Sequence, residues 1–126
     1  MITRLVDRIQ TLRATLWTLI APPLVWAAHF LLSYLWASVL CAKRGAFATE
    51  PALFWGCTVL ALVVIVGCGV IAHIQSRVPG DNPPHEQGTK VDRLRFLAYS
   101  TLLLAGLSFI GVIFTAVPVL FLTDCR

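Results

Sequence analysis

Long apolar runs alternate with short charged segments along the whole chain. Three stretches contain no Asp, Glu, Lys or Arg, namely residues 14–42, 51–76 and 96–123, which are 29, 26 and 28 residues long. A helix of about 20 apolar residues crosses the ~30 Å hydrocarbon layer of a bilayer, so each stretch suffices for one crossing and not for two. No stretch alternates with period two, and an open sheet leaves backbone groups unpaired in lipid. The pattern predicts an all-α integral membrane protein with three transmembrane helices.

A pair of prolines is expected to start the first span. Pro22 and Pro23 lack backbone N–H donors and clash with the preceding turn, so a helix is more easily started there than continued through them. A helix over residues 22–41 contains 20 residues. At 1.5 Å per residue it is ~30 Å long, which matches the hydrocarbon layer. We therefore place the first span at residues 22–41.

A polar loop is expected to join the other two spans. Residues 76–89 contain three prolines and two glycines, a composition typical of an irregular connection. Pro51 is tolerated in the first turn of a helix, so we expect the second span over residues 51–75. The third span is expected over residues 90–122. With the N-terminal segment, these elements are predicted to form one membrane domain.

The N-terminal segment has the periodicity of an amphipathic helix. Apolar residues recur at steps of three and four, and the charged residues fall largely on the remaining face; the apolar set is Ile2, Leu5, Val6, Ile9, Leu12 and Leu16. Such a helix lies in the membrane interface with its arginines near the lipid head groups. We expect an interfacial helix over residues 1–20. The alternative is that this segment simply extends the first span.

The net charge of +4 arises from residues that flank the spans. Seven of the ten Lys and Arg lie in the N-terminal segment or between the second and third spans, and three lie on the opposite side of the membrane. The positive-inside rule then predicts a bacterial inner-membrane protein with its N-terminus in the cytoplasm and its C-terminus in the periplasm. These charges suit lipid head groups, and we expect no nucleic-acid partner. The first apolar run is longer than that of a signal peptide, so we expect it to be retained.

Few residues are candidates for chemistry, because the spans contain no carboxylate. No Ser–His–Asp set, phosphate-binding loop or metal-ligand spacing is present, so we expect neither an enzyme nor a metal site. No polar path crosses the outer half of any span, which disfavours a channel or transporter. His29 is the candidate that lies deep within a span. On a helix it shares a face with Trp26, Ser33 and Trp36. Its simplest role is a neutral imidazole hydrogen-bonded to a carbonyl or hydroxyl of a neighbouring helix.

His29 also has alternative roles, because a polar residue in a span points to a function by default. It lies ~10 Å from the predicted start of the first span, and His73 lies ~6 Å inside the same boundary. The two residues are therefore expected at similar depth on different helices. Two facing imidazoles are a ligand set for a six-coordinate b-type haem. The alternative function is a small b-type cytochrome or electron carrier with haem b between His29 and His73, and a proton-carrying or quinone-contacting role for His29 remains open.

Two of the four cysteines are candidates for a disulfide. Cys41 ends the first span and Cys125 follows the third, and the predicted orientation places both in an oxidising compartment. They can pair if their Cα atoms come within ~7 Å. The alternatives are two free thiols, or a pair between Cys41 and Cys57. Cys57 and Cys68 lie ~16 Å apart along the second span and cannot pair with each other.

The first span also carries a resemblance. The run from Pro23 to Phe30 (PLVWAAHF), with Cys41-Ala42 at the end of the span and a terminal cysteine, resembles small three-span bacterial inner-membrane proteins that accompany haem–copper terminal oxidases, above all cytochrome c oxidases. Beyond the first span only the three-span pattern is shared. The resemblance implies a non-catalytic accessory subunit or assembly partner of such an oxidase, without a cofactor of its own. Trp26, His29 and Trp36 would then form a partner-contact face, with Ser33 as a close-packing position beside them.

Overall fold

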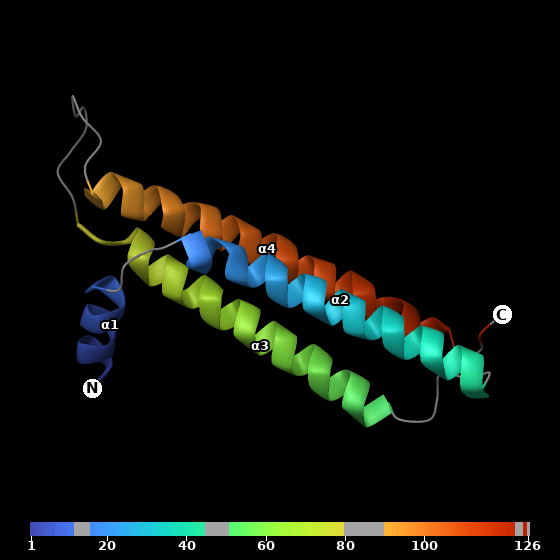
Figure 1. Cartoon of the computed structure of the whole chain (residues 1–126). Helices are drawn as coiled ribbons and strands as arrows, with labels where there is room; N and C mark the ends of the chain where they lie inside the picture. Colours follow the sequence, from blue (N-terminus) through green and yellow to red (C-terminus); the bar gives the residue numbers. More distant parts are fainter. Residues whose placement is uncertain (12–15, 45–50, 80–89, 123–124, 126) are drawn as a thin grey trace.

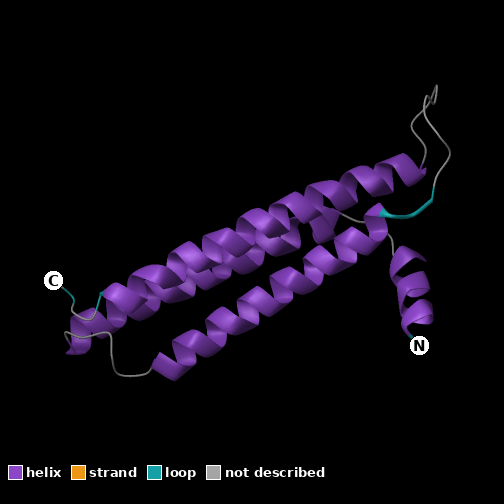
Figure 2. Ribbon diagram, turned by 180° about the vertical axis from the view of Figure 1, so that it is seen from behind, coloured by secondary structure: helices purple, strands orange, loops and turns teal. Residues whose placement is uncertain are grey.

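The computed structural model describes residues 1–11, 16–44, 51–79, 90–122 and 125. These residues form four helices and no strand: α1 (Ile2–Thr11), α2 (Leu16–Arg44), α3 (Pro51–Ser76) and α4 (Lys90–Phe121). Helices α2, α3 and α4 run side by side as an elongated bundle, and α1 lies at one end of it (Figure 1). Seen from behind, the N-terminus and the C-terminus lie at opposite ends of the bundle (Figure 2).

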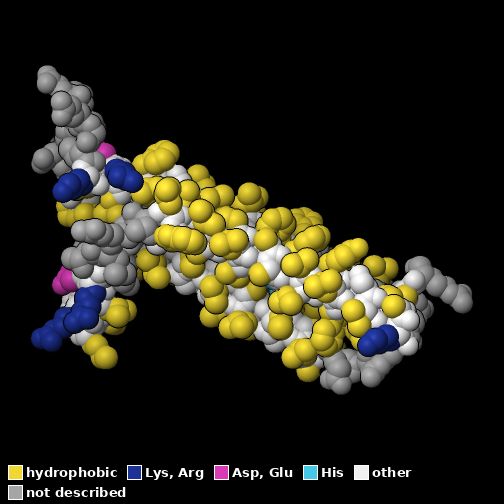
Figure 3. Space-filling model, viewed as in Figure 1, with side chains coloured by type: hydrophobic (Ala, Val, Ile, Leu, Met, Phe, Trp, Pro, Cys, Tyr) yellow, Lys and Arg dark blue, Asp and Glu magenta, His cyan; other side chains and the backbone are white. Residues whose placement is uncertain are grey.

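Helices α2, α3 and α4 are long and apolar enough to cross a membrane. Their apolar parts are Leu16–Lys43, Pro51–Ser76 and Lys90–Phe121, with mean hydropathies of 1.7, 2.6 and 2.3. Hydrophobic side chains cover most of the visible surface of the bundle (Figure 3), as expected where lipid replaces water as the solvent. The prediction of an all-α integral membrane protein with three spans after a short amphipathic helix is confirmed.

The prediction that the first span begins at Pro22 is wrong. Helix α2 begins at Leu16, so Pro22 and Pro23 lie inside it. The two prolines cannot donate to the carbonyls four residues earlier, but spans tolerate such gaps when neighbouring groups compensate. The side chain of Pro22 is fully buried in the bundle. Its packing therefore offsets part of the lost hydrogen bonding.

The N-terminal helix is separate from the first span and shorter than predicted. Helix α1 ends at Thr11, whereas residues 1–20 were expected to be helical, and residues 12–15 lie outside the described residues. Figure 1 shows α1 turned away from the direction of α2, so the N-terminal segment does not simply extend the span. Helix α1 contacts α3, while Ile2 and Leu5 expose apolar side chains. This arrangement suits a helix lying at the membrane interface.

The second and third spans have nearly the predicted bounds. Helix α3 ends one residue later than expected, at Ser76, and α4 ends one residue earlier, at Phe121. Pro118 lies within α4, whose last turn continues past it. Of the predicted loop, residues 77–79 are described and are not helical, while residues 80–89 lie outside the described residues.

The packed core lies mainly between α3 and α4. Ile65 of α3 and Val112 of α4 are almost completely buried and belong to one cluster with Ala61 and Ala105, against which Val25 of α2 packs. Small side chains at such positions let helix backbones approach closely, and close packing is what holds spans together where lipid is as apolar as the helices.

Arg95 links the start of α4 to the end of α3. Its Nε and Nη2 atoms both donate to the carbonyl oxygen of Val78, at 2.9 and 2.6 Å. Val78 lies two residues after the end of α3, so this charge-assisted contact joins the two helices where the chain leaves the bundle. We call this end, which also carries α1, the basic end.

The side chain of Trp26 on α2 packs directly on Gly111 of α4. A Cβ atom built on Gly111 would lie 2.6 Å from Nε1 of Trp26 and 2.8 Å from its Cδ1. These distances are far below van der Waals contact, so the indole occupies the space that any side chain at position 111 would need. The absence of a side chain at Gly111 therefore makes room for the indole of Trp26 in this position.

Replacing Gly111 with alanine should lower the free energy of unfolding by about 1–3 kcal/mol, the usual cost of forcing an extra methyl group into a packed contact. Gly67→Ala is the matched control, because a Cβ atom there meets nothing within 4 Å. Unfolding of both variants by SDS in mixed micelles, followed by circular dichroism, measures the difference. Equal stability of the two variants would contradict the packing of Trp26 on Gly111.

Candidate functional site at His29

His29 is a buried polar side chain near the middle of α2. It is only 4% exposed, and its Nε2 atom lies 3.0 Å from the hydroxyl oxygen of Thr58 on α3. The hydroxyl of Thr58 donates its own hydrogen to the carbonyl oxygen of Phe54 at 2.9 Å. A hydroxyl has one hydrogen to donate, so towards His29 it acts as an acceptor. Nε2 of His29 therefore carries a proton and donates it to Thr58.

The second ring nitrogen of His29 is buried as well. Nδ1 has no hydrogen-bond partner among the described residues. In a neutral imidazole with the proton on Nε2, this nitrogen is a bare acceptor, whereas a charged imidazolium would bury an unpaired N–H and a full charge. The arrangement is that of a neutral histidine.

A small cavity adjoins the ring. Its volume is about 40 Å³, and its lining includes Ser33 and Trp36 of α2 and Cys57 of α3. This volume is enough for one water molecule and much too small for a porphyrin. The imidazole also packs against the ring of Phe54, with 6.0 Å between centroids, and Phe54 meets Trp55 edge-on. The ring of His29 is thus enclosed by α3.

The structure shows the simplest of the roles predicted for His29, a hydrogen bond to a hydroxyl of a neighbouring helix. The partner itself, Thr58, was not predicted. A signal for it is present in the sequence, because Thr58 is the only hydroxyl residue of α3 apart from Ser76 at its end. Choosing Thr58 also requires the register between α2 and α3, which the sequence pattern does not supply.

The prediction that His29 and His73 lie at similar depth is wrong. His29 is level with Thr58, and His73 follows Thr58 by 15 residues on the same helix. This separation is ~22 Å along the axis, so one haem iron cannot bind both imidazoles of a chain. The error arose because depth was measured from Pro22, whereas α2 begins at Leu16. The geometry does not favour a b-type cytochrome with these two ligands.

The predicted partner-contact face lies partly inside the bundle, with His29 buried, Ser33 and Trp36 partly buried and Trp26 exposed. His29 bonds to α3, Trp26 packs on Gly111 of α4, Ser33 donates to the carbonyl of His29 at 2.7 Å, and Trp36 lines the small cavity. Trp26 keeps 38% of its surface exposed. A partner therefore cannot dock on His29, and the prediction is wrong for that residue. The physical reason is that a bundle needs an inward face on each helix, and this stripe provides it for α2.

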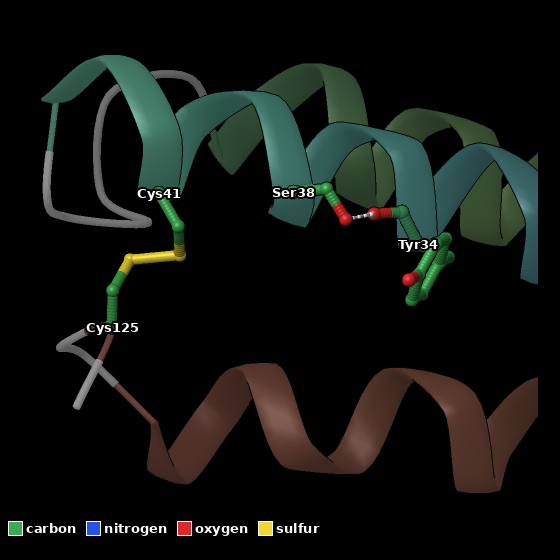
Figure 4. Close-up of a disulfide and its surroundings, with 4 residues drawn as sticks. All are labelled: Tyr34, Ser38, Cys41 and Cys125. Carbon is green, nitrogen blue, oxygen red and sulfur yellow. Dashed lines mark hydrogen bonds between the residues drawn. A yellow bond between two sulfur atoms is a disulfide. The ribbon is translucent and has the colours of Figure 1, made fainter.

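A disulfide joins α2 to the segment after α4 (Figure 4), at the end of the bundle opposite the basic end. The Cα atoms of Cys41 and Cys125 lie 5.6 Å apart, and 84 positions separate the two residues in sequence. This is the predicted pair. Cys57 and Cys68 are free thiols in the structure, so the alternative pair of Cys41 with Cys57 is not formed. We call this the cystine end.

Within the described part of the chain, no group of three or more His, Cys, Asp or Glu residues is placed to hold a metal ion. Comparison of the chain with models of protein families, with characterised proteins and with solved structures finds no match. The function therefore has to be inferred from the geometry of the chain itself. That geometry assigns His29 to holding α2 against α3.

Thr58→Val should lower the free energy of unfolding by about 1–2 kcal/mol, because His29 loses its acceptor inside the bundle. Thr101→Val is the matched control: Thr101 is equally buried and donates to its own helix, at Leu97, as Thr58 does at Phe54. Of these two hydroxyls, that of Thr58 also makes a hydrogen bond to a second helix, through His29. The same loss of stability in both variants, measured by SDS unfolding, would show that the contact to His29 contributes nothing.

Counting thiols tests the disulfide. The chain has four cysteines, of which two are free in the structure. Protein taken from membranes without reductant and unfolded in SDS should react with two maleimides per chain, and with four after reduction. Cys41→Ser should give three in either case, because it frees Cys125. Four reactive thiols before reduction would contradict the disulfide.

Proposed function

We propose that this chain is a non-catalytic accessory subunit or assembly partner of a larger respiratory membrane complex, most specifically a haem–copper cytochrome c oxidase. The observation that carries the proposal is how little of α2 the bundle covers. Between Leu16 and Lys43 only Pro22 and His29 are buried. A span with so few buried residues is typical of a subunit that completes its packing against another membrane protein.

The outer face of α2 is the proposed contact surface. It consists of exposed apolar residues at steps of three and four along the helix, which point away from the bundle: Leu24, Ala28, Leu31, Leu35 and Val39. This spacing is that of a helix packing against another helix. This face replaces the predicted one, because His29 at the centre of the predicted face is buried within the chain. The choice of an oxidase rests on the resemblance carried by residues 23–30.

The same proposal places the chain in the bacterial inner membrane with its N-terminus in the cytoplasm and its C-terminus in the periplasm. Two observations support this orientation. Described Lys and Arg residues gather at the basic end (Figure 3), where the positive-inside rule expects the cytoplasm. The disulfide lies at the other end, and disulfides persist in the oxidising periplasm.

Affinity purification from native membranes in a mild detergent tests the proposal. Tagged chain should bring down oxidase subunits in a fixed ratio. Leu31→Ala with Leu35→Ala should reduce their recovery several-fold, because each change removes apolar contact area from the proposed surface. Leu103→Ala with Leu107→Ala is the matched control, since both leucines are exposed on α4. Recovery of the chain alone or as a pure homo-oligomer would overturn the proposal, as would equal recovery with both double variants.

A further inference from the structure

An apolar groove runs along the outside of the contact between α3 and α4. Its volume is about 550 Å³, and its lining comes from α3 and α4 alone, including Gly69 and Val70 on one side and Leu102 and Phe109 on the other. His73 is the polar residue of the lining. The groove does not touch α2, so it is separate from the surface proposed above for a protein partner.

The groove exists because two of the residues that line it, Gly69 and Gly106, have no side chain. Gly69 has no Cβ, and one built there would lie 3.6 Å from the Cβ of Ala105. The helices are therefore close together at this point. At Gly106 an added Cβ would meet nothing within 4 Å, so this residue borders open space. The groove is the space that two glycines leave beside a close helix contact.

Basic residues lie where the groove reaches the basic end. His73 in the last turn of α3 is exposed, and so is Arg77, the residue that directly follows the helix. Arg95 lies on the same face of α4 as Leu102, seven residues before it, and is held in place by its contact with the carbonyl of Val78. From Ile65 to Arg77 the axial distance is ~18 Å, close to the ~15 Å thickness of one leaflet of hydrocarbon.

We propose that this groove binds a phospholipid with an anionic head group. One acyl chain lies in the apolar groove beside Gly69 and Gly106, and the phosphate lies at the basic end beside His73 and Arg77. Phosphate accepts charge-assisted hydrogen bonds from guanidinium groups, and basic pockets between spans are suited to anionic head groups. A second copy of the chain in parallel orientation is a poorer occupant, because it would bring the same positive charge to the same place.

Native mass spectrometry of the full-length protein tests the head-group contact. The protein is released from detergent that contains equal amounts of phosphatidylglycerol and phosphatidylcholine with identical acyl chains. The wild type should retain one phosphatidylglycerol in preference to phosphatidylcholine. Arg77→Gln should reduce this preference about fivefold, the effect of one basic residue near an anionic head group. Arg93→Gln should leave it unchanged, because Arg93 is an exposed residue at the same end of α4 but on the face away from the groove.

A second pair of variants tests the acyl-chain contact. Gly106→Leu should abolish retention of either lipid, because the new side chain fills the groove without meeting another atom at its Cβ. Gly67→Leu is the matched control: its Cβ also meets nothing within 4 Å, and it lies at similar depth away from the groove. It should retain lipid as the wild type does.

Three results would overturn the lipid site. The first is equal retention of both lipids by the wild type. The second is the same lipid preference in Arg77→Gln and Arg93→Gln. The third is release of the protein as a dimer that Gly106→Leu converts to monomer, which would put a second copy in the groove. The first two results leave the accessory-subunit proposal untouched, because that proposal rests on the outer face of α2, which does not line the groove.

Discussion

The hydrogen bond from His29 to Thr58 is the buried polar contact that holds α2 against α3. Hydrocarbon offers no water to a buried imidazole, so the polar ring must find its partner within the protein. The bond sets the register of α2 along α3. The same register places the ring of Phe54 against the imidazole and separates His29 from His73. A residue that suggests a cofactor ligand in the sequence thus acts in the structure as a link between helices.

Specific contacts join the helices at both ends of the bundle, and tight packing between these ends is limited to a few positions. Arg95 joins α4 to the end of α3 at the basic end, and the disulfide joins α2 to the chain after α4 at the cystine end. Between these, Gly69 lies close to Ala105 on α4, and Gly111 makes room for the indole of Trp26. The remaining apolar surface faces outward. Its two distinctive parts lie on opposite sides, the outer face of α2 for a protein and the groove of α3 and α4 for a lipid.

The fold could be predicted because charged side chains are costly in hydrocarbon and are therefore absent from the membrane-spanning stretches of the sequence. The three charge-free stretches locate the spans, and the resulting topology brings Cys41 and Cys125 to one end, where they pair. The start of α2 could not be predicted, because the local rule for proline was outweighed by burial of Pro22. Thr58 as the partner of His29, and the axial separation of His29 from His73, depend on the register of α2 along α3. Hydrophobic periodicity does not determine this register.

The protonation of the His29 ring tests the account most directly. Nitrogen NMR of ¹⁵N-histidine protein in detergent, with His73→Gln and His85→Gln to leave one histidine, reports which ring nitrogen carries hydrogen. The geometry predicts a neutral ring at neutral pH, with the proton on Nε2 and none on Nδ1, because Thr58 uses its own hydrogen on Phe54. A proton on Nδ1, on that nitrogen alone or on both, would contradict the bond that holds α2 to α3.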